Sequence, residues 1–374
     1  MGADLGREDE ATEFIEGLER LDEGILSLTS MVNRRGRATV LFGVDDDGNI
    51  IGDGYGTEHI NIIRDRVRAM VEPEIPVDVV PEEVPSGMEY IRMSAVSSDI
   101  PYSFDGRYYY RDGTSDELAT VDILRRMVMC GAGDRMVDLC SNVQELTFTS
   151  FLAYLESSGV HAGFTREHLR DLGMLTESGD YNQVAYLMSD QNNTLMQVVR
   201  FDGMTKASAI TYRTDFGNRC LLLSMRAVLD YIWSMNETKV EFRGGMRLDT
   251  HLFDIEAFRE AWINACVHNY WADMLPPAVF VFDDRIEIFS RGGIPFLLSE
   301  DDFLSGRSMP LNKALHDIVS MVDFTGYGRR GVPAVVERYG KETIEASDHF
   351  VTVRIPFSFT PIWVSSRDGM PRND

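Results

Sequence analysis

The chain has 374 residues, with 36 Lys+Arg against 60 Asp+Glu, so its formal net charge at pH 7 is −24. A charge of this sign argues against a protein that coats phosphate backbones, although it is compatible with a local nucleic-acid site. Apolar residues make up 44% of the chain, which excludes a disordered or fibrous protein. We therefore expect two or three globular domains.

The chain shows no signal for membrane insertion or for an oxidising compartment. It has no run of eighteen apolar residues, and its acidic N-terminus lacks the hydrophobic core of a signal peptide. The cysteines are scattered without a C-x-x-C pair, at Cys130, Cys140, Cys220 and Cys266. We expect a soluble, cytoplasmic protein with no membrane partner, with reduced core cysteines and no structural zinc site.

Residues 1–118 are predicted to form a first domain of mixed helix and strand. Apolar residues at helical spacing stop at Arg34-Arg35-Gly36-Arg37, so a helix should end there. β-rich segments separated by turn sequences predict strands. In chain order we expect a helix over 21–32, a strand over 38–44, an acidic turn over 45–49, a return strand from 50, a helix over 60–71 and two short strands over 100–115.

The rest of the chain is predicted to form a mixed helix and strand middle region over 119–250 and a layered α/β domain over 251–374. The fold class is therefore α+β. The expected elements are helices over 124–139, 141–156 and 254–270, and strands over 278–282, 285–289 and 349–356.

Three carboxylates form a first candidate site. Glu8 and Glu13 are five residues apart, and Asp45 follows the strand predicted over 38–44. Convergent carboxylates repel one another unless a divalent cation neutralises them, and Mg²⁺ or Mn²⁺ held by oxygen ligands can activate water for attack on a phosphodiester. Spacing alone also allows three solvated acids with no common role.

The order of features over residues 7–118 resembles the Schlafen AlbA-type domain. The resemblance rests on Glu13-Phe14, on the helix that ends near Asn33 and Gly36, and on the segments Gly43-Val44-Asp45-Asp46-Asp47-Gly48, Ile51-Gly52, Pro101-Tyr102 and Tyr110-Arg111-Asp112-Gly113-Thr114-Ser115. It implies a ribonuclease site of Glu8, Glu13 and Asp45, with Asp46 as the alternative register. Ile15 stands where the family usually has Lys, which removes a positive charge that could orient a phosphate.

Arginines and aromatic residues cluster in the same segments. Arg34, Arg35, Arg37, Arg107 and Arg111 accompany Tyr102 and Tyr108-Tyr109-Tyr110. Guanidinium groups and aromatic faces grip phosphates and stack on bases, so these arginines and Tyr102 are candidate nucleic-acid contacts. The alternative is a strand pair with core aromatics and solvated arginines.

A second candidate site lies on the helix predicted over 254–270. Glu260, Asn264 and His268 recur at intervals of four residues and should project from one helix face. An Asn oxygen can bind Mg²⁺, and a Glu one turn earlier can polarise a water near a γ-phosphate. These polar residues could equally cap neighbouring elements.

The run from about 144 to 356 resembles the divergent histidine-kinase-type (GHKL) ATPase domain, an α/β sandwich. The resemblance rests on the helix motif and on Gly292-Gly293, Gly306-Arg307 and Gly331-Val332-Pro333. It implies that Asn264 holds Mg²⁺, that Glu260 is the general base, and that Gly292, Gly293 and Gly331 line an ATP pocket. Ser290-Arg291 replaces the family's Asn-Pro and Arg329-Arg330-Gly331 replaces its Gly-x-Gly, which disfavours hydrolysis.

Two functional hypotheses follow from these resemblances. The leading one is a metal-dependent endoribonuclease that acts on structured RNA such as tRNA, with a role in phage defence or stress. The alternative is a non-catalytic DNA-binding transcriptional regulator with a nucleotide-sensing or dimerising ATPase-like domain. A structural partner in a larger assembly is a third reading, and a homodimer or higher oligomer is compatible with each.

Overall fold

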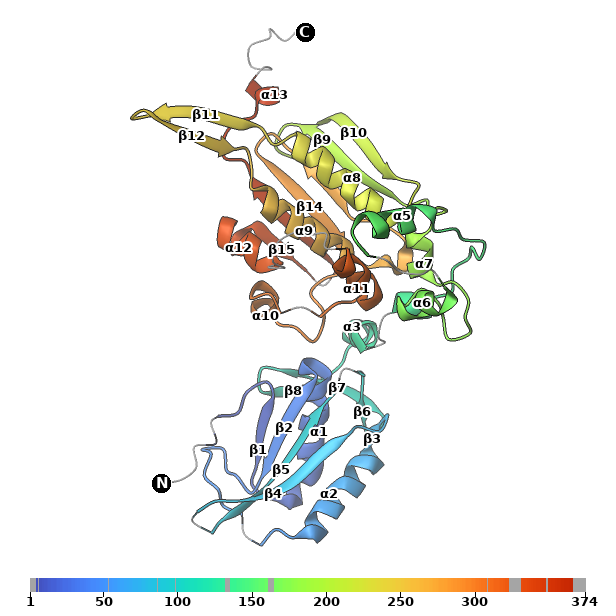
Figure 1. Ribbon diagram of the computed structural model, residues 1–374. Coiled ribbons are helices and arrows are strands. Elements are labelled where there is room, and N and C mark those ends of the chain that lie inside the picture. The colour runs from blue at the N-terminus through green and yellow to red at the C-terminus, as the bar shows by residue number, and fades with distance from the viewer. Residues whose placement is uncertain are drawn as a thin grey trace. The chain divides into compact units, whose positions relative to one another are not determined.

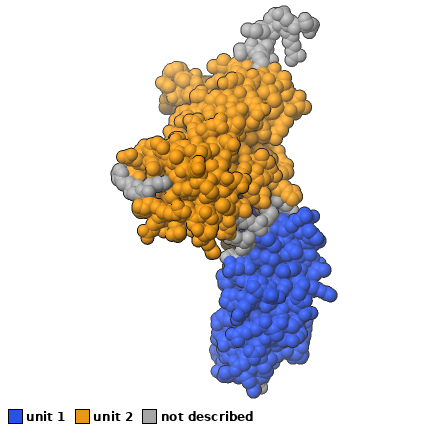
Figure 2. Space-filling view, turned by 90° about the vertical axis from the view of Figure 1, so that its right-hand side faces the viewer, with its two compact units in different colours: residues 1–133, 295–299 blue, residues 134–294, 300–374 orange. Residues whose placement is uncertain are grey.

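The computed structural model describes residues 5, 7–52, 54–85, 87–97, 99–131, 135–160, 165–307, 309–322, 331–347 and 349–365. The chain divides into two compact units (Figure 2). Unit 1 comprises residues 1–133 and 295–299, and unit 2 comprises residues 134–294 and 300–374. Both units mix helices with sheets, which confirms the predicted α+β class.

Unit 1 contains two four-stranded sheets (Figure 1). The first has the order β1-β2-β5-β4, with β1 parallel to β2 and the other pairs antiparallel. The second has the antiparallel order β3-β6-β7-β8. The strands are β1 (Thr12–Ile15), β2 (Arg37–Phe42), β3 (Val71–Glu72), β4 (Val77–Glu83), β5 (Glu89–Val96), β6 (Ser103–Phe104), β7 (Arg107–Asp112) and β8 (Ser115–Leu118), and the helices are η1 (Leu18–Arg20), α1 (Leu21–Arg35), α2 (Thr57–Met70) and α3 (Val121–Gly131).

Helix α1 is the centre of unit 1, because it contacts β2 of the first sheet and β7 of the second. Its apolar residues Ile25, Leu28, Met31 and Val32 are fully buried. The helix ends at Gly36, which has a positive φ of 67° and donates its N–H to the carbonyl of Val32 at 2.8 Å. Gly is favoured at such a left-handed helix end, and the predicted end of this helix is confirmed.

Asn33 connects α1 to the second sheet. Its side chain is fully buried, its amide donates to the carbonyls of Tyr102 and Tyr109, and its oxygen accepts the N–H of Tyr102, each at 2.8 Å. Without these bonds, three backbone groups of β7 and the segment before β6 would be buried unpaired. Asn33 therefore has a structural role.

Unit 2 is built on a six-stranded sheet with the order β10-β9-β13-β14-β16-β15. Helices α8 and α9 share one large apolar cluster with this sheet, so they cover one of its faces (Figure 1). The sheet strands are β9 (Leu195–Asp202), β10 (Ala209–Gly217), β13 (Ala278–Val281), β14 (Arg285–Arg291), β15 (Ile344–Ala346) and β16 (Phe350–Pro356). The helices are α4 (Arg135–Asp138), α5 (Thr149–Ser157), α6 (Arg166–Asp171), α7 (Gln183–Met188), α8 (Leu221–Ser234), α9 (Ile255–Val267), η2 (Trp271–Asp273), α10 (Glu300–Leu304), α11 (Lys313–Met321), α12 (Val332–Tyr339), η3 (Lys341–Thr343) and α13 (Ile362–Ser365).

The middle region predicted over 119–250 does not form a unit of its own. Strand β9 of this region pairs in parallel with β13, so β9 and its neighbour β10 belong to the same sheet as the C-terminal strands, and the region falls in the same compact unit. A boundary at 250 would cut a single hydrophobic cluster. The predicted boundary differs from the observed one because the partner strand of β9 lies about eighty residues later in the chain. Local sequence patterns carry no information on such pairing.

A separate two-stranded antiparallel hairpin, β11 (Thr238–Arg243) and β12 (Met246–His251), extends from unit 2 (Figure 1). Cys220 and Cys266 are buried as expected, whereas Cys130 is half-buried and Cys140 is exposed. Within the described ranges, no helix has the length and apolar character needed to cross a bilayer.

We predict that Asn33→Ala lowers the unfolding free energy of unit 1 by about 2–4 kcal/mol, since it leaves three buried backbone groups unpaired. Hydrogen–deuterium exchange of the α1 amides would measure the loss. Asn61→Ala, on the exposed side of α2, is the control and should change stability by less than about 0.5 kcal/mol. Equal protection of α1 in both variants would contradict the structural role.

Candidate functional site

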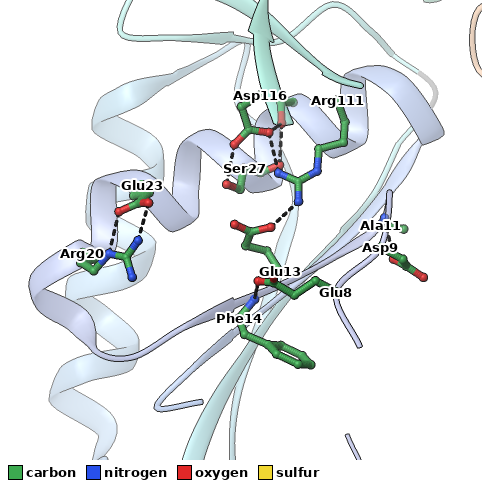
Figure 3. Close-up of polar contacts among 11 residues, drawn as sticks. Glu8, Asp9, Ala11, Glu13, Phe14, Arg20, Glu23, Ser27, Arg111 and Asp116 are labelled. Carbon is green, nitrogen blue, oxygen red and sulfur yellow. Dashed lines mark hydrogen bonds and ion pairs between the residues drawn. The ribbon is translucent and has the colours of Figure 1, made fainter. Parts of the chain in front are cut away.

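Glu8 and Glu13 lie together at the edge of the first sheet of unit 1 (Figure 3). Strand β1 is the outer strand, and it pairs only with β2 among the described strands. The N–H of Phe14 therefore has no strand partner on the outer side, and Glu8 accepts it at 2.9 Å. This bond satisfies an edge donor and holds the Glu8 carboxylate close to that of Glu13.

Glu13 is bound by a buried arginine. Arg111, in β7, is 1% exposed and forms ion pairs with Glu13 and with Asp116 of β8, the latter at 2.9 Å (Figure 3). A buried guanidinium requires compensating negative charge, since its desolvation is costly. The two carboxylates supply that charge from two different sheets.

The Glu13 carboxylate also has a perturbed proton affinity. Burial raises the pKa of Glu13 from 4.5 to about 7, and the neighbouring charges of Glu8 and Asp116 add to this effect. Arg111 lowers the pKa, but its positive charge is shared with Asp116. Near neutral pH the site can therefore gain or lose a proton at Glu13.

Asp45 does not join this pair in the structure. Its carboxylate accepts the N–H of Asp47 at 3.1 Å and that of Asn49 at 2.7 Å, and both oxygens also accept the Asn49 side-chain amide. These bonds hold the pKa of Asp45 below its usual range. Asp45 thus stabilises its own turn, and Asp46, the alternative register, is exposed.

The three predicted metal ligands do not fit a metal ion in this arrangement. Among the described residues, no cluster of three or more His, Cys, Asp and Glu side chains could hold one. The Glu13 carboxylate is bound by Arg111, and the Asp45 carboxylate accepts hydrogen bonds from its own turn, so both are already engaged by other groups. The expected convergence of Glu8, Glu13 and Asp45 is met only by the first two residues.

The sequence did not point to three polar residues of this network, namely Asp116, Ser27 and Ser30. Ser27 of α1 donates to Asp116 at 2.6 Å, and Ser30, also of α1, donates to the other Asp116 oxygen. Both serines are buried, three residues apart, on a helix whose buried face is mostly apolar. That spacing was the available signal, because polar residues on a buried helix face require partners.

The predicted nucleic-acid contacts divide into surface and interior residues. Tyr102 and Arg111 are 2% and 1% exposed, so they cannot contact a nucleic acid in this conformation. Tyr102 is buried because its hydroxyl bonds Ser97 and its backbone bonds Asn33. The prediction that these two side chains contact a nucleic acid is therefore wrong, because both pack in the interior of unit 1.

The other four arginines lie nearer the surface. Arg34 lies over the ring of Phe296 at 5.0 Å and donates to its carbonyl, and Arg35 pairs with Glu10. Arg37 and Arg107 are exposed, and neither forms an ion pair within the described part of the chain. They are the two predicted contacts that remain available to a phosphate.

In unit 2 the predicted residues of α9 meet the N-terminus of α12. Glu260 is 7% exposed and accepts the N–H of Gly331 at 2.9 Å. A methyl group added at Gly331, which has a φ of 56°, would lie 3.3 Å from Nδ2 of Asn264. Glu260, Asn264 and Gly331 are therefore brought together, as expected.

Gly292 directly follows β14 and lies beside the C-terminal end of α9. Its φ is 86°, its N–H donates to His349 at 2.8 Å, and an added methyl group would lie 3.6 Å from the carbonyl of His268. His268 is one turn beyond Asn264, so Gly292 is placed at the C-terminal end of α9. Gly293 follows and is half-buried. Arg329 and Arg330 lie outside the described residues.

Two family models match the chain. Residues 8–120 match the family described as "Schlafen, AlbA_2". Residues 276–353 match the family described as "Putative ATP-dependent DNA helicase recG C-terminal". Unit 1 therefore carries a Schlafen AlbA_2 domain and unit 2 carries a domain of the recG C-terminal type, which confirms both resemblances. The first match indicates a function related to nucleic acids.

The chain is also similar to a solved structure, that of the DIP2311 protein from Corynebacterium diphtheriae. The TM-score is 0.50 at 19% sequence identity, over 95% of this chain and 76% of that one. This likeness supports the fold alone. No curated protein matches the chain.

We predict that Glu13 makes unit 1 less stable as the pH rises from about 4.5 to about 7, because the folded chain binds the Glu13 proton more tightly than the unfolded chain does. Glu13→Gln removes this dependence. Its unfolding free energy, relative to wild type, should rise by about 1–3 kcal/mol between pH 5 and pH 8.

Hydrogen exchange of the β1 and α1 amides at both pH values measures this difference. Asp22→Asn is the control, since Arg66 holds the pKa of Asp22 below its ordinary value and Asp22 stays ionised over this range. If the unfolding free energy of Glu13→Gln relative to wild type changed with pH no more than that of Asp22→Asn, the proton affinity assigned to Glu13 would be contradicted.

Proposed function

We propose that this chain, with its Schlafen AlbA_2 and recG C-terminal-type domains, is a DNA-binding regulator that does not cut nucleic acid, and that unit 2 binds an adenine nucleotide without hydrolysing it. The absence of nuclease activity is inferred from the ion pair between Glu13 and the buried Arg111. A carboxylate bound to a guanidinium is a poor metal ligand, because the two cations compete for the same oxygens.

The surface of unit 1 supports binding through few contacts. Arg37 and Arg107 are exposed at the starts of β2 and β7, and each can donate to phosphate oxygens. With a net charge of −24 the rest of the protein repels a nucleic acid. Binding should therefore be local and should weaken steeply with salt. The family description matched by unit 2 names a DNA helicase, which favours DNA as the ligand.

The contacts of α9 with the start of α12 support nucleotide binding in unit 2. Asn264 offers an amide oxygen for Mg²⁺, and Gly331 opens α12, whose N-terminus favours an anion. When bound, Mg²⁺ would neutralise phosphate charge there. The Glu260 carboxylate already accepts the Gly331 N–H, which lowers its capacity to take a proton from water. This contact favours binding of a nucleotide over its hydrolysis.

A metal-dependent endoribonuclease that acts on structured RNA such as tRNA is the second candidate. The adjacent Glu8 and Glu13 carboxylates favour it, because paired acids of this kind occur in hydrolytic sites. Its connection to phage defence remains a prediction from the family resemblance.

We predict that wild-type protein binds duplex DNA and that Arg37→Glu/Arg107→Glu weakens binding by roughly tenfold or more, with a shallower salt dependence. Fluorescence anisotropy at several salt concentrations measures both quantities. Arg125→Glu is the matched control, since Arg125 is an exposed arginine of the same unit that already pairs with Asp122.

Cleavage is tested with the same protein. Incubation with tRNA and with DNA, each with Mg²⁺ or Mn²⁺, should leave both intact. Cleavage by wild type that is lost in Glu13→Gln would establish the nuclease and overturn the non-catalytic proposal.

We predict that Asn264→Ala weakens binding of a fluorescent ATP analogue with Mg²⁺ by roughly tenfold or more, because it removes an oxygen ligand. Glu256→Gln, an exposed first-turn residue of the same helix, should bind like wild type. Equal affinity of the two variants, or phosphate release by wild type that Glu260→Gln abolishes, would contradict this part of the proposal.

A further inference from the structure

The β11–β12 hairpin is an arm with two exposed faces. Its strands join through Gly244-Gly245, which have positive φ values of 59° and 79°, as the tightest hairpin turns require. Four apolar side chains are 45–76% exposed, namely Val240, Phe242, Met246 and Leu248. Alternation places the first two on one face of the arm and the last two on the other.

Such an arm is poorly stabilised by itself. A two-stranded ribbon in water is marginally stable, and it gains stability when further strands pair with it. No other strand of the described chain pairs with β11 or β12, and they form a sheet of two. Exposed strand edges and exposed apolar residues together indicate a partner that adds strands.

The charges of the arm fit a second copy of the same chain. Residues 238–251 carry three basic and two acidic side chains, a net charge of +1 in a chain of −24, so this arm escapes the self-repulsion of the rest. In β12, Arg247 and Asp249 flank Leu248. When two β12 strands meet antiparallel with Leu248 opposite Leu248, each Arg247 faces the Asp249 of the other copy.

Backbone geometry is compatible with this register. In a two-residue hairpin the residues beside the turn bond each other, so the outward-pointing backbone groups of β12 belong to Arg247 and Asp249. These residues would exchange hydrogen bonds across the two-fold axis. The base of β11 is less accessible, because the Ile362 N–H binds Glu237, immediately before that strand, at 3.0 Å.

We propose that the chain forms a homodimer through this arm, with β12 paired antiparallel to β12 of a second copy and Leu248 on the two-fold axis. The result is a four-stranded sheet that also groups the exposed apolar side chains of the two arms. Each arginine of the arm already has an acidic neighbour, Asp249 for Arg247 and Glu241 for Arg243, which disfavours a nucleic acid as the occupant. The inference is independent of the proposed function.

Charge reversal tests the pairing with the full chain. Arg247→Asp and Asp249→Arg each place like charges opposite one another in a homodimer, so each alone should weaken dimerisation by roughly tenfold or more. In an equimolar mixture of the two variants, every charge again faces its opposite. Sedimentation velocity should show a dimer in wild type and in the mixture, and monomers for either variant alone.

A cross-link tests the register. In a Cys140→Ser background, Leu248→Cys should form a disulfide-linked dimer under mild oxidation, since directly opposed residues have the required spacing. Val240→Cys, of similar exposure on β11, is the matched control and should remain monomeric. Val240 of one chain would lie opposite Val240 of the second chain only if β11, and not β12, formed the interface.

Four results would overturn the proposal. The first is a wild-type protein that stays monomeric at high concentration, and the second is a dimer that neither charge variant weakens. The third is cross-linking at Val240 in place of Leu248. Variants that keep the wild-type oligomeric state but lose nucleic-acid binding would assign the arm to that ligand and overturn it equally.

Discussion

The burial of one guanidinium determines the arrangement of unit 1. Arg111 enters from β7, and its charge is balanced by Glu13 of the first sheet and Asp116 of the second. Two serines of α1 bind the same aspartate, so both sheets and the helix between them depend on a single polar network. A buried charge tolerates no missing partner, because an uncompensated ion in the interior costs several kcal/mol.

Because of this constraint, the candidate site in unit 1 differs chemically from the candidate site in unit 2. In unit 1 the carboxylates are held for structural reasons, and the raised pKa of Glu13 reflects burial beside a shared cation. In unit 2 the polar residues of α9 face the glycine that opens α12, where backbone and amide groups are suited to a phosphate. The geometry thus favours a nucleotide at the second site more than a metal at the first.

Much of the local structure was predictable. Helical spacing and Gly36 predicted the end of α1, and turn sequences predicted short strands over 100–115, where the structure has β6, β7 and the start of β8. The α9 motif brought Glu260 and Asn264 onto one face, as their spacing required. The burial of Tyr102 and Arg111 was not predictable, since a tyrosine or an arginine looks the same in sequence whether it faces solvent or a buried partner.

By itself the sequence determined the fold class, several of the helices and strands, the two family resemblances and the residues worth testing, because these depend on local pattern and on motif order. Only the tertiary structure decided which residues meet. It paired β9 with β13, committed Asp45 to its own turn and Glu13 to Arg111, and left the arm of β11 and β12 exposed. Those outcomes depend on contacts between distant segments and on competition for each charged group, which no local window contains.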